Sequence, residues 1–478
     1  MPELIVSPRY TSLESLQPDL RSGKTTCVRE AAYYLQRIED TRQLNTYVSV
    51  FAEEILTKAA QLDDKIKNSP EKLGKLFGAI VAIKDVICYA GHKVTASSKI
   101  LGDFHSLFSA TAVERILAED ALIIGVTNCD EFAMGSSNEN SRYGAVGNGY
   151  APQLVPGGSS GGAAVAVQTD TCLVSLGTDT GGSVRQPAGF CGVFGLKPTY
   201  GRISRHGLIA YGSSFDQLGI LSHSISDAAL FLEVMAGADD HDSTSAHQEV
   251  PAYSRQLTPP AAVRLCYFKE AVEHPGIDAA IKANFLQTIE KLRNEGHVVD
   301  PIGFPYLDYI IPAYYVLTTA EASSNLARYD GVRFGYSHPG AKNLRETYLQ
   351  SRTQGFGAEA KRRILLGTFV LSSGYYDAYY TKAQQVRRLI AATTKAIFDD
   401  YHYILLPASP VLPWSIGDKV DDPVAMYLAD IFTVHANMAG IPAICVPTGF
   451  TDKGLPVGTQ LMAAPFHEAQ LLAFASQL

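Results

Sequence analysis

The sequence lacks the features of a disulfide-stabilised, metal-binding or membrane-spanning protein. Its seven cysteines include no C-x-x-C pair, so neither a disulfide framework nor a zinc site is indicated. Cys88, Cys172, Cys191 and Cys445 stand in apolar surroundings, which is typical of reduced cysteines in the core of a cytosolic protein. No apolar run of transmembrane length and no signal or transit peptide is recognised. We therefore expect a cytoplasmic protein with no membrane contact.

Nucleotide and catalytic-metal motifs are also missing. The 478 residues contain no P-loop and no H-E-x-x-H, so we expect this chain to bind neither ATP nor a metal ion itself. The net charge of −8 and the lack of a basic run exclude a broad basic surface for nucleic acid. With 46% hydrophobic and 18% charged residues, the composition is typical of a globular protein with a large hydrophobic core.

Apolar strand-like runs and amphipathic helical segments alternate along the chain, which indicates an α/β fold with a mixed sheet. Residues 28–67 read as helices, 110–127 as a helix followed by a strand, and VRLCYF, YHYILLP and PAICVPTGF as strands. Without a repeat or a low-complexity linker, we expect a single domain over 1–478. Its parts are a helical N-terminal region (1–75), a catalytic core (76–262) and a mainly helical insertion or cap (305–400).

Two glycine-rich turns each present a serine. Ser159 lies in GGSSGG and Ser183 in DTGGSVRQPA, and an apolar segment with almost no charge separates them. Glycine permits positive φ and a close approach of substrate to the main chain. Such a turn can direct successive N–H groups at a developing oxyanion, so Thr180, Gly181, Gly182 and Ser183 are the predicted donors.

A candidate base lies upstream in the apolar strand FGAIVAIKDVIC, whose one lysine is Lys84. A lysine buried in such a strand loses charge or finds a partner, and burial can lower its pKa by roughly 3–5 units from about 10.4. A lysine near a strand end can instead extend to solvent. Together Lys84, Ser159 and Ser183 suggest a Ser–Ser–Lys relay, with one serine as nucleophile and the other as proton carrier.

A competing interpretation is the nucleophile elbow of an α/β-hydrolase. GGSSGG satisfies G-x-S-x-G centred on Ser159 or Ser160, but the elbow needs a strand that leads directly into the serine. The preceding residues end in Pro156 and do not read as a central strand. The histidines that could complete a triad stand in no recognisable motif: His206, His223, His402 and His435.

The GGSSGG turn, the DTGGS turn, the R-Q-P-A run and the upstream lysine resemble the amidase signature family over nearly the whole chain. This resemblance implies a central mixed sheet flanked by helices on both faces, with a helical elaboration. It also implies Ser183 as the nucleophile, Lys84 as the base, and Ser159 as the bridging serine after a cis peptide bond.

Four further segments resemble the A subunits of glutamyl-tRNA(Gln) amidotransferases: 130–141, 321–336, 361–390 and 421–443. The resemblance implies a heterotrimer in which this chain hydrolyses L-glutamine and releases ammonia to a B subunit. That B subunit would bind tRNA and use ATP and Mg²⁺, and a small C subunit would wrap the interface. Two alternatives stay open: a stand-alone amidase for small aliphatic or aryl amides, and a non-catalytic scaffold.

Free glutamine is a zwitterion, so its pocket needs one cation and one anion. The resemblance places these at Arg363, whose guanidinium would hold the carboxylate, and Asp430, with Tyr314 lining the pocket. Arg362 is an alternative to Arg363, and Asp430 could instead be a surface acid of a helix.

Overall fold

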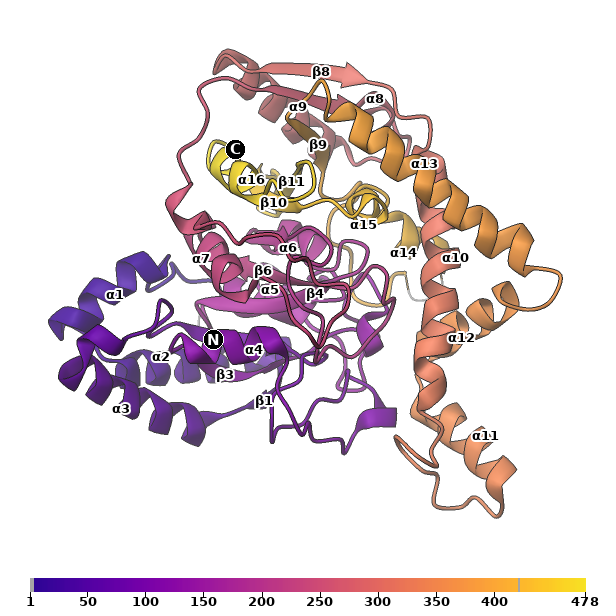
Figure 1. Cartoon of the computed structure of the whole chain (residues 1–478), viewed down its shortest axis with the longest axis horizontal. Helices are drawn as coiled ribbons and strands as arrows, with labels where there is room; N and C mark the ends of the chain where they lie inside the picture. Colours follow the sequence, from indigo (N-terminus) through magenta and orange to yellow (C-terminus); the bar gives the residue numbers. More distant parts are fainter. Residues whose placement is uncertain (1–3, 420–421) are drawn as a thin grey trace.

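A single mixed sheet runs through the molecule (Figure 1). The computed structural model describes residues 4–419 and 422–478, so Asp421, the first residue of the segment 421–443, lies outside the described residues. The described strands form an 11-stranded sheet in the order β1-β3-β2-β4-β6-β5-β10-β11-β9-β7-β8. They are β1 (Tyr47–Val50), β2 (Ile80–Lys84), β3 (Leu122–Thr127), β4 (Val174–Asp179), β5 (Phe194–Lys197), β6 (Gln217–Ser222), β7 (Arg264–Phe268), β8 (Val298–Ile302), β9 (Tyr403–Pro407), β10 (Ala443–Phe450) and β11 (Pro456–Met462).

Parallel and antiparallel pairs coexist in this sheet, which confirms the predicted mixed α/β architecture. Strand β2 is parallel to both β3 and β4, and β7 is parallel to both β8 and β9. The strands between these two parallel groups pair antiparallel.

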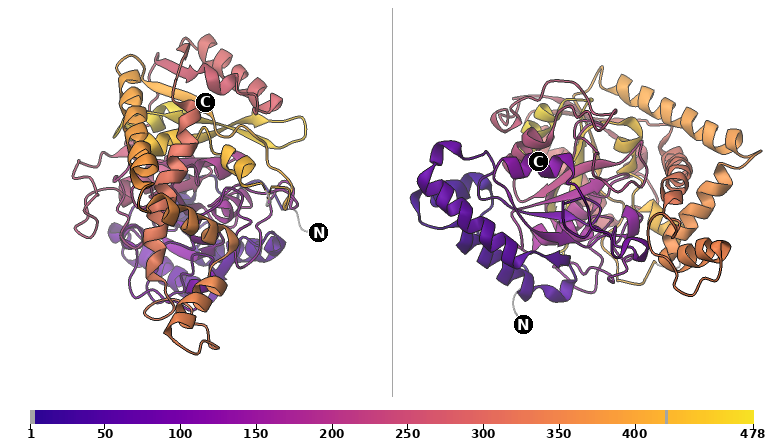
Figure 2. Two further views of the ribbon diagram at one scale, coloured as in Figure 1. Left: turned by 90° about the vertical axis from the view of Figure 1, so that its right-hand side faces the viewer. Right: turned by 60° about the horizontal axis from the view of Figure 1, so that its bottom comes forward.

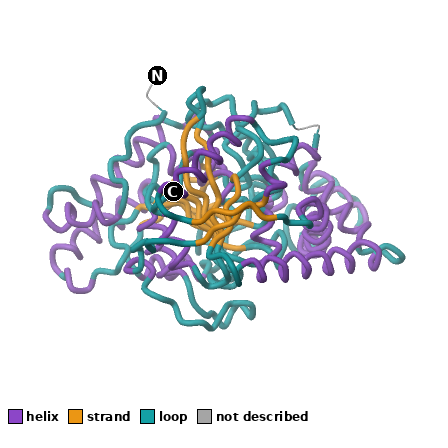
Figure 3. The backbone as a smooth tube through the Cα atoms, turned by 90° about the horizontal axis from the view of Figure 1, so that it is seen from above, coloured by secondary structure: helices purple, strands orange, loops and turns teal. Residues whose placement is uncertain are grey.

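Helices cover both faces of the sheet, as the tube view from above shows (Figure 3). They are α1 (Leu13–Ser22), α2 (Cys27–Asp40), α3 (Ala52–Asn68), α4 (Thr111–Ala118), α5 (Gly161–Gln168), α6 (Arg185–Cys191), α7 (Ile225–Met235), α8 (Lys269–Val272), α9 (Ala279–Asn294), α10 (Leu307–Asn325), α11 (Leu344–Gly355), α12 (Ala358–Val370), α13 (Lys382–Ile397), α14 (Pro423–Leu428), α15 (Val434–Ala439) and α16 (Glu468–Ala475). Helices α1–α3 lie on one side of the molecule and α10–α13 on the opposite side (Figures 1 and 2).

The N-terminal region contains the helices predicted within 28–67 as α2 and α3, together with a strand that was not predicted. Its helices α2 and α3 are interrupted by β1, which pairs antiparallel with β3 at the edge of the sheet. The strand is only four residues long, Tyr47–Val50, and follows Asn45 in the left-handed region at φ 58°. Alternation over so few residues is too short to separate from the flanking helical periodicity.

The two motifs and the lysine are brought together at the carboxyl ends of parallel strands. Every residue of β2 is buried, and Lys84 is its last residue. The neighbouring β4 ends at Asp179, so the turn that carries Ser183 begins at the same edge. All eight residues of α5 are buried, which explains the uncharged segment between the two serines. Ligands of open α/β sheets bind in the crevice at this edge.

None of the described helices is long and apolar enough to cross a membrane. All seven cysteines are buried and free, as their apolar sequence surroundings suggested for four of them. No group of three or more His, Cys, Asp or Glu within 4–419 and 422–478 could hold a metal ion.

Candidate active site

The two glycine-rich turns are bound to each other. The peptide bond between Gly158 and Ser159 is cis, as the family resemblance implied. The Gly158 N–H donates to the side-chain oxygen of Gln186 at 2.9 Å, and the Ser160 N–H donates to the Ser183 carbonyl at 3.1 Å. The first turn is therefore held directly against the second.

Lys84 is completely buried and points at three hydroxyl groups. Its Nζ lies 2.8 Å from Ser159 Oγ, 2.9 Å from Ser160 Oγ and 2.9 Å from Thr178 Oγ1. The lysine therefore does not extend to solvent. A neutral amine has two N–H groups and one lone pair, so only one of these three hydroxyls can donate to it.

The remaining hydrogen bonds distinguish the two adjacent serines, whereas the Thr178 hydroxyl, like that of Ser159, has no other partner among the described residues. Ser160 Oγ donates its proton to the Thr178 carbonyl at 3.1 Å, so it can only accept from Lys84. Ser159 Oγ makes no other hydrogen bond among the described residues, and its proton is free to point at Nζ. Of the two adjacent serines, Ser159 is thus the better placed to pass a proton to Lys84.

Burial lowers the pKa of Lys84 to about 8, while Cys129, Asp130, Asp179 and Asp216 act in the opposite direction. Without a carboxylate in contact with Nζ, desolvation of the ammonium prevails. An amine with this pKa exists to a useful extent in its neutral form near physiological pH. It can therefore work as a general base.

The second turn is fixed by a buried ion pair. The Arg185 guanidinium contacts the Asp179 carboxylate through two hydrogen bonds, at 2.9 and 3.0 Å, and both side chains are fully buried. Although burial alone would raise the pKa of Asp179, Arg185 lowers it to about 2. The carboxylate is thus permanently charged and can hold the N–H groups of the turn.

One predicted oxyanion donor is already occupied, which corrects the four-residue prediction. The Gly182 N–H donates to Asp179 Oδ1 at 2.9 Å and cannot also face a substrate oxyanion. The N–H groups of Thr180, Gly181 and Ser183 have no such partner in the part of the chain that the structure describes, and they remain candidates. Gly182 itself has φ +129°, and an added Cβ would overlap Thr433 Oγ1, so glycine is required there.

Ser183 is the member of the predicted relay that faces the substrate side. It is 8% exposed, whereas Lys84 and Ser159 are fully buried. Its Oγ forms no hydrogen bond with any described residue. The hydrogen bond between Ser183 and Ser159 that the proton relay requires is therefore not formed in this structure. Catalytic hydrogen bonds are often long in the free enzyme and tighten when substrate binds. The hydroxyl of Tyr314 lies against this turn, 2.5 Å from where a Cβ on Gly181 would stand.

Arg363 extends inward from α12 and is held from several sides. Its Nε donates to Glu359 at 2.8 Å and its Nη1 to the Tyr211 hydroxyl at 2.7 Å. The rings of Tyr211, Tyr315 and Tyr427 surround the guanidinium at 5.2 to 5.5 Å. Nη2 has no hydrogen-bond partner among the described residues, so this nitrogen is left for a ligand.

Arg362 and Arg363 differ in their exposure. The Arg363 side chain is 3% exposed, whereas the Arg362 side chain is 47% exposed, and both form ion pairs with the buried Glu359. Only Arg363 faces the interior, where Tyr314 and Asp430 also lie.

Asp430 is buried and only half satisfied, and it is not a surface acid. The Ser136 hydroxyl donates to its Oδ2, whereas Oδ1 is buried without a hydrogen-bond partner. Burial raises the pKa of Asp430 to about 7, although Ser136 and Arg363 act to lower it. An unpaired carboxylate oxygen in this position fits a cationic ligand group. Thr433 connects Asp430 to the second turn, since its Oγ1 donates to the Gly181 and Asp430 carbonyls.

Several residues of the site were not singled out from the sequence. Ser136 lies in the segment 130–141, and Thr178 is the next-to-last residue of β4, just before the second turn. Glu359 stands four residues before Arg363, a spacing that favours an ion pair on a helix and could have been recognised. No sequence signal indicates Tyr211, which reaches Arg363 across 152 residues.

The nucleophile-elbow interpretation finds no support in this geometry. Residues 155–160 form no strand, and none of the described histidines hydrogen-bonds to Ser159, Ser160 or Ser183. The four histidines considered earlier have partners elsewhere: His206 with Thr111, His223 with Val167, His402 with Arg264 and His435 with Thr394.

Comparison with known proteins identifies the family of the chain. A family model described as Amidase matches residues 30–472. The glutamyl-tRNA(Gln) amidotransferase A subunit of Chlorobaculum tepidum is 49% identical over 476 residues, covering 98% of each chain. That of Prosthecochloris aestuarii is 51% identical over 471 residues, with the same coverage of both chains.

Solved structures give the same result. The crystal structure of the glutamyl-tRNA(Gln) amidotransferase A subunit from Thermotoga maritima matches with a TM-score of 0.77 and 36% identity, covering 96% of this chain and 94% of that one. A peptide amidase from Stenotrophomonas maltophilia matches with a TM-score of 0.83 and 27% identity, covering 98% and 96%. The predicted fold is confirmed, and the chain belongs to the amidase family, in the group that includes the glutamyl-tRNA(Gln) amidotransferase A subunits.

Proposed function

We propose that this chain is the glutamine-hydrolysing component of a glutamyl-tRNA(Gln) amidotransferase. The observation that carries the proposal is that two buried side chains, Arg363 and Asp430, each keep one atom, Nη2 and Oδ1, without a partner among the described residues. Asp430 is linked through Thr433 to the turn that presents Ser183. One cationic and one anionic group beside a nucleophile suit a substrate that carries both an α-carboxylate and an α-ammonium group. The relatives named above are A subunits of this amidotransferase.

In the mechanism we infer, neutral Lys84 accepts the proton of Ser159 while Ser159 accepts that of Ser183. Ser183 Oγ then attacks the side-chain amide carbon of glutamine. The N–H groups of Thr180, Gly181 and Ser183 stabilise the oxyanion of the tetrahedral intermediate. The proton returns through Ser159 to the leaving nitrogen, the C–N bond breaks, and ammonia departs. Water then hydrolyses the glutamyl ester by the same route and releases glutamate.

The partners and co-substrates in this proposal lie outside the chain. We infer a B subunit that binds the tRNA and uses ATP and Mg²⁺ to activate Glu-tRNA(Gln), and a C subunit that wraps the interface. Ammonia released beside Ser183 would pass to the B subunit and convert Glu-tRNA(Gln) to Gln-tRNA(Gln). We place this assembly in the cytoplasm.

Glutamine hydrolysis is expected to increase with pH up to about 8, because only neutral Lys84 can accept a proton. Below its pKa, the neutral fraction of Lys84 falls about tenfold for each pH unit, and kcat/KM should fall with it. The raised pKa of Asp430, about 7, acts in the same direction, since its ionised form binds the ammonium group. A profile of kcat/KM measured between about pH 6 and pH 10 checks this, and a flat profile would contradict the lysine as base.

The proposed function is tested by ammonia release from L-glutamine. We expect weak release by the chain alone and a sharp increase when B and C subunits, ATP and Glu-tRNA(Gln) are added, with the Ser183→Ala chain as the blank. If these partners do not change the rate and simple amides are cleaved faster than glutamine, the chain is a stand-alone amidase. A chain with no turnover under any of these conditions would be a scaffold.

A further inference from the structure

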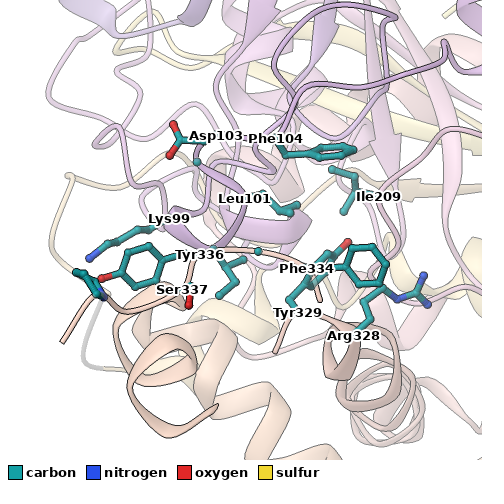
Figure 4. Close-up of a pocket in the computed structure, with 14 residues that line it drawn as sticks. Lys99, Leu101, Asp103, Phe104, Ile209, Arg328, Tyr329, Phe334, Tyr336 and Ser337 are labelled. Atoms are coloured by element: carbon teal, nitrogen blue, oxygen red, sulfur yellow. The ribbon is translucent and has the colours of Figure 1, made fainter. Parts of the chain in front are cut away.

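A cavity of about 780 Å³ lies away from the active site, between two loops (Figure 4). One loop is the 3-10 turn Lys99–Leu101 with the residues up to Phe104, and the other joins α10 to α11. The Tyr336 N–H donates to the Ile100 carbonyl at 2.7 Å and holds the two loops together. Apolar and aromatic side chains form most of the lining: Ile100, Leu101, Phe104, Tyr329, Phe334 and Tyr336.

Exposed apolar side chains also stand on the elements next to the cavity. Phe334 is 59% exposed, and Leu344, Tyr348 and Leu349 are exposed on the adjacent α11, which contacts the Lys99–Leu101 turn. Isolated exposed apolar residues need no explanation, but several of them on neighbouring elements beside a cavity are typical of an interaction site. Aromatic residues in particular are enriched at the centres of protein interfaces.

Two cations and one acid line the cavity: Lys99, Arg328 and Asp103, and Asp103 pairs with Lys93 at 3.8 Å. The lining thus has a net positive charge, although the whole chain has a net charge of −8. Residues 326–355 contain two acidic residues, Asp330 and Glu346, and both have partners. Asp330 pairs with Arg333, and the Glu346 carboxylate accepts hydrogen bonds from the Lys342 N–H and the Asn343 side-chain amide. Of the five basic residues in the same segment, Arg333 is the partner of Asp330, and Arg352 donates to the Leu326 and Tyr329 carbonyls. The other three form no ion pair among the described residues: Arg328, Lys342 and Arg345. Lys99, on the opposite loop, lies 4.5 Å from the centre of the Tyr336 ring.

From this combination we propose that the cavity binds an acidic amphipathic segment of another subunit of the amidotransferase, an inference that rests on the proposed function. Apolar side chains of that segment would fill the cavity, and its Asp or Glu residues would face the cations Lys99 and Arg328. The charged lining residues Lys99, Asp103 and Arg328 are all exposed, so recognition inside the cavity is apolar. An apolar interior with charged residues only at its edge fits a peptide segment better than a small polar ligand, which needs several polar groups that point at it.

The two loops that form the cavity are connected to segments that carry the active site. The loop leading to Lys99 is bound to Asp85, the neighbour of Lys84, through the Thr95 and Ser97 N–H groups at 2.8 Å each. The other loop continues from α10, which carries Tyr314. A subunit that consumes ammonia from this site is therefore a suitable source of the bound segment.

The test is assembly with the B and C subunits of the same source, co-expressed with this chain. We expect Phe334→Asp to raise the dissociation constant of the complex at least about 10-fold, measured by analytical ultracentrifugation. Arg328→Glu, which leaves the apolar lining intact, should weaken assembly less and reduce its salt dependence. The matched control is Phe450→Asp, because Phe450 is 61% exposed and lies in β10, which contributes nothing to the cavity. Equal melting temperatures of the variants exclude a folding defect.

Each other outcome overturns the docking proposal in a recognisable way. If wild type assembles and Phe334→Asp assembles equally well, the cavity is not the docking site and the proposed function stands. Equal weakening by Phe334→Asp and Phe450→Asp would also reject the cavity. If the chain alone forms a dimer that Phe334→Asp separates, the occupant is a second copy. If wild type does not assemble with B and C at all, the proposed function fails together with the docking proposal.

Discussion

Ser183→Ala is expected to abolish glutamine hydrolysis, and Lys84→Ala to lower kcat by about 10²- to 10⁴-fold. Without Ser183 no glutamyl ester can form, whereas without Lys84 the nucleophile remains but no group accepts its proton. Ammonia release in the assembled complex measures both effects, and mass spectrometry of the trapped ester locates the nucleophile. An ester on Ser160, or near-normal activity of Lys84→Ala, would show that the relay is wrong.

The adjacent serines provide an internal control for this relay. Both hydroxyls lie within 2.9 Å of Lys84 Nζ, but Ser160 already donates its proton to the Thr178 carbonyl. We therefore expect Ser159→Ala to lower kcat by about 10²-fold or more and Ser160→Ala to lower it less than about 10-fold. The two substitutions remove the same atom from neighbouring buried positions. The reverse order would mean that the proton travels through Ser160.

The residues of this site that could be predicted from the sequence are those that lie in short motifs. A buried apolar strand ending in a lysine, and two glycine-rich turns with serines, indicated three residues that the structure places at one edge of the sheet. Glycine patterns and apolar runs express local constraints, which a single sequence displays directly. The strands around them were recognisable for the same reason.

The details that escaped prediction depend on contacts between distant residues or on the direction of one hydrogen bond. Ser136 meets Asp430 across 294 residues, and no spacing rule connects them. The glycine pattern predicts Gly182 as an oxyanion donor. Whether its N–H is free depends on the orientation of the Asp179 carboxylate, which accepts a hydrogen bond from it. That carboxylate is oriented by Arg185, which in turn contacts the Thr433 carbonyl 248 residues away. Local pattern thus indicates the residue types, and tertiary packing decides which donors remain available.

The charge requirements of the substrate pocket give the last prediction. Asp430→Asn is expected to lower kcat/KM for L-glutamine by about 30- to 10³-fold, because a buried ammonium group would lose its carboxylate partner. The same variant should act almost as well as wild type on the glutamine analogue that lacks the α-ammonium group. Arg363→Lys keeps a positive charge beside Glu359, so the helix can fold, but it loses the planar guanidinium that grips a carboxylate.

Both variants should therefore lose activity on L-glutamine but differ in their activity on the two analogues. Arg363→Lys should lose activity on glutamine and on the analogue without the ammonium group, while an amide without the α-carboxylate should be cleaved as by wild type. Comparison of kcat/KM for the three compounds with the three proteins checks this pattern. If both variants lost activity equally on all three compounds, Arg363 and Asp430 would be supporting the shape of the pocket. In that case the preference for a zwitterionic substrate would have to come from other residues, and the proposed glutaminase activity would lose its main structural support.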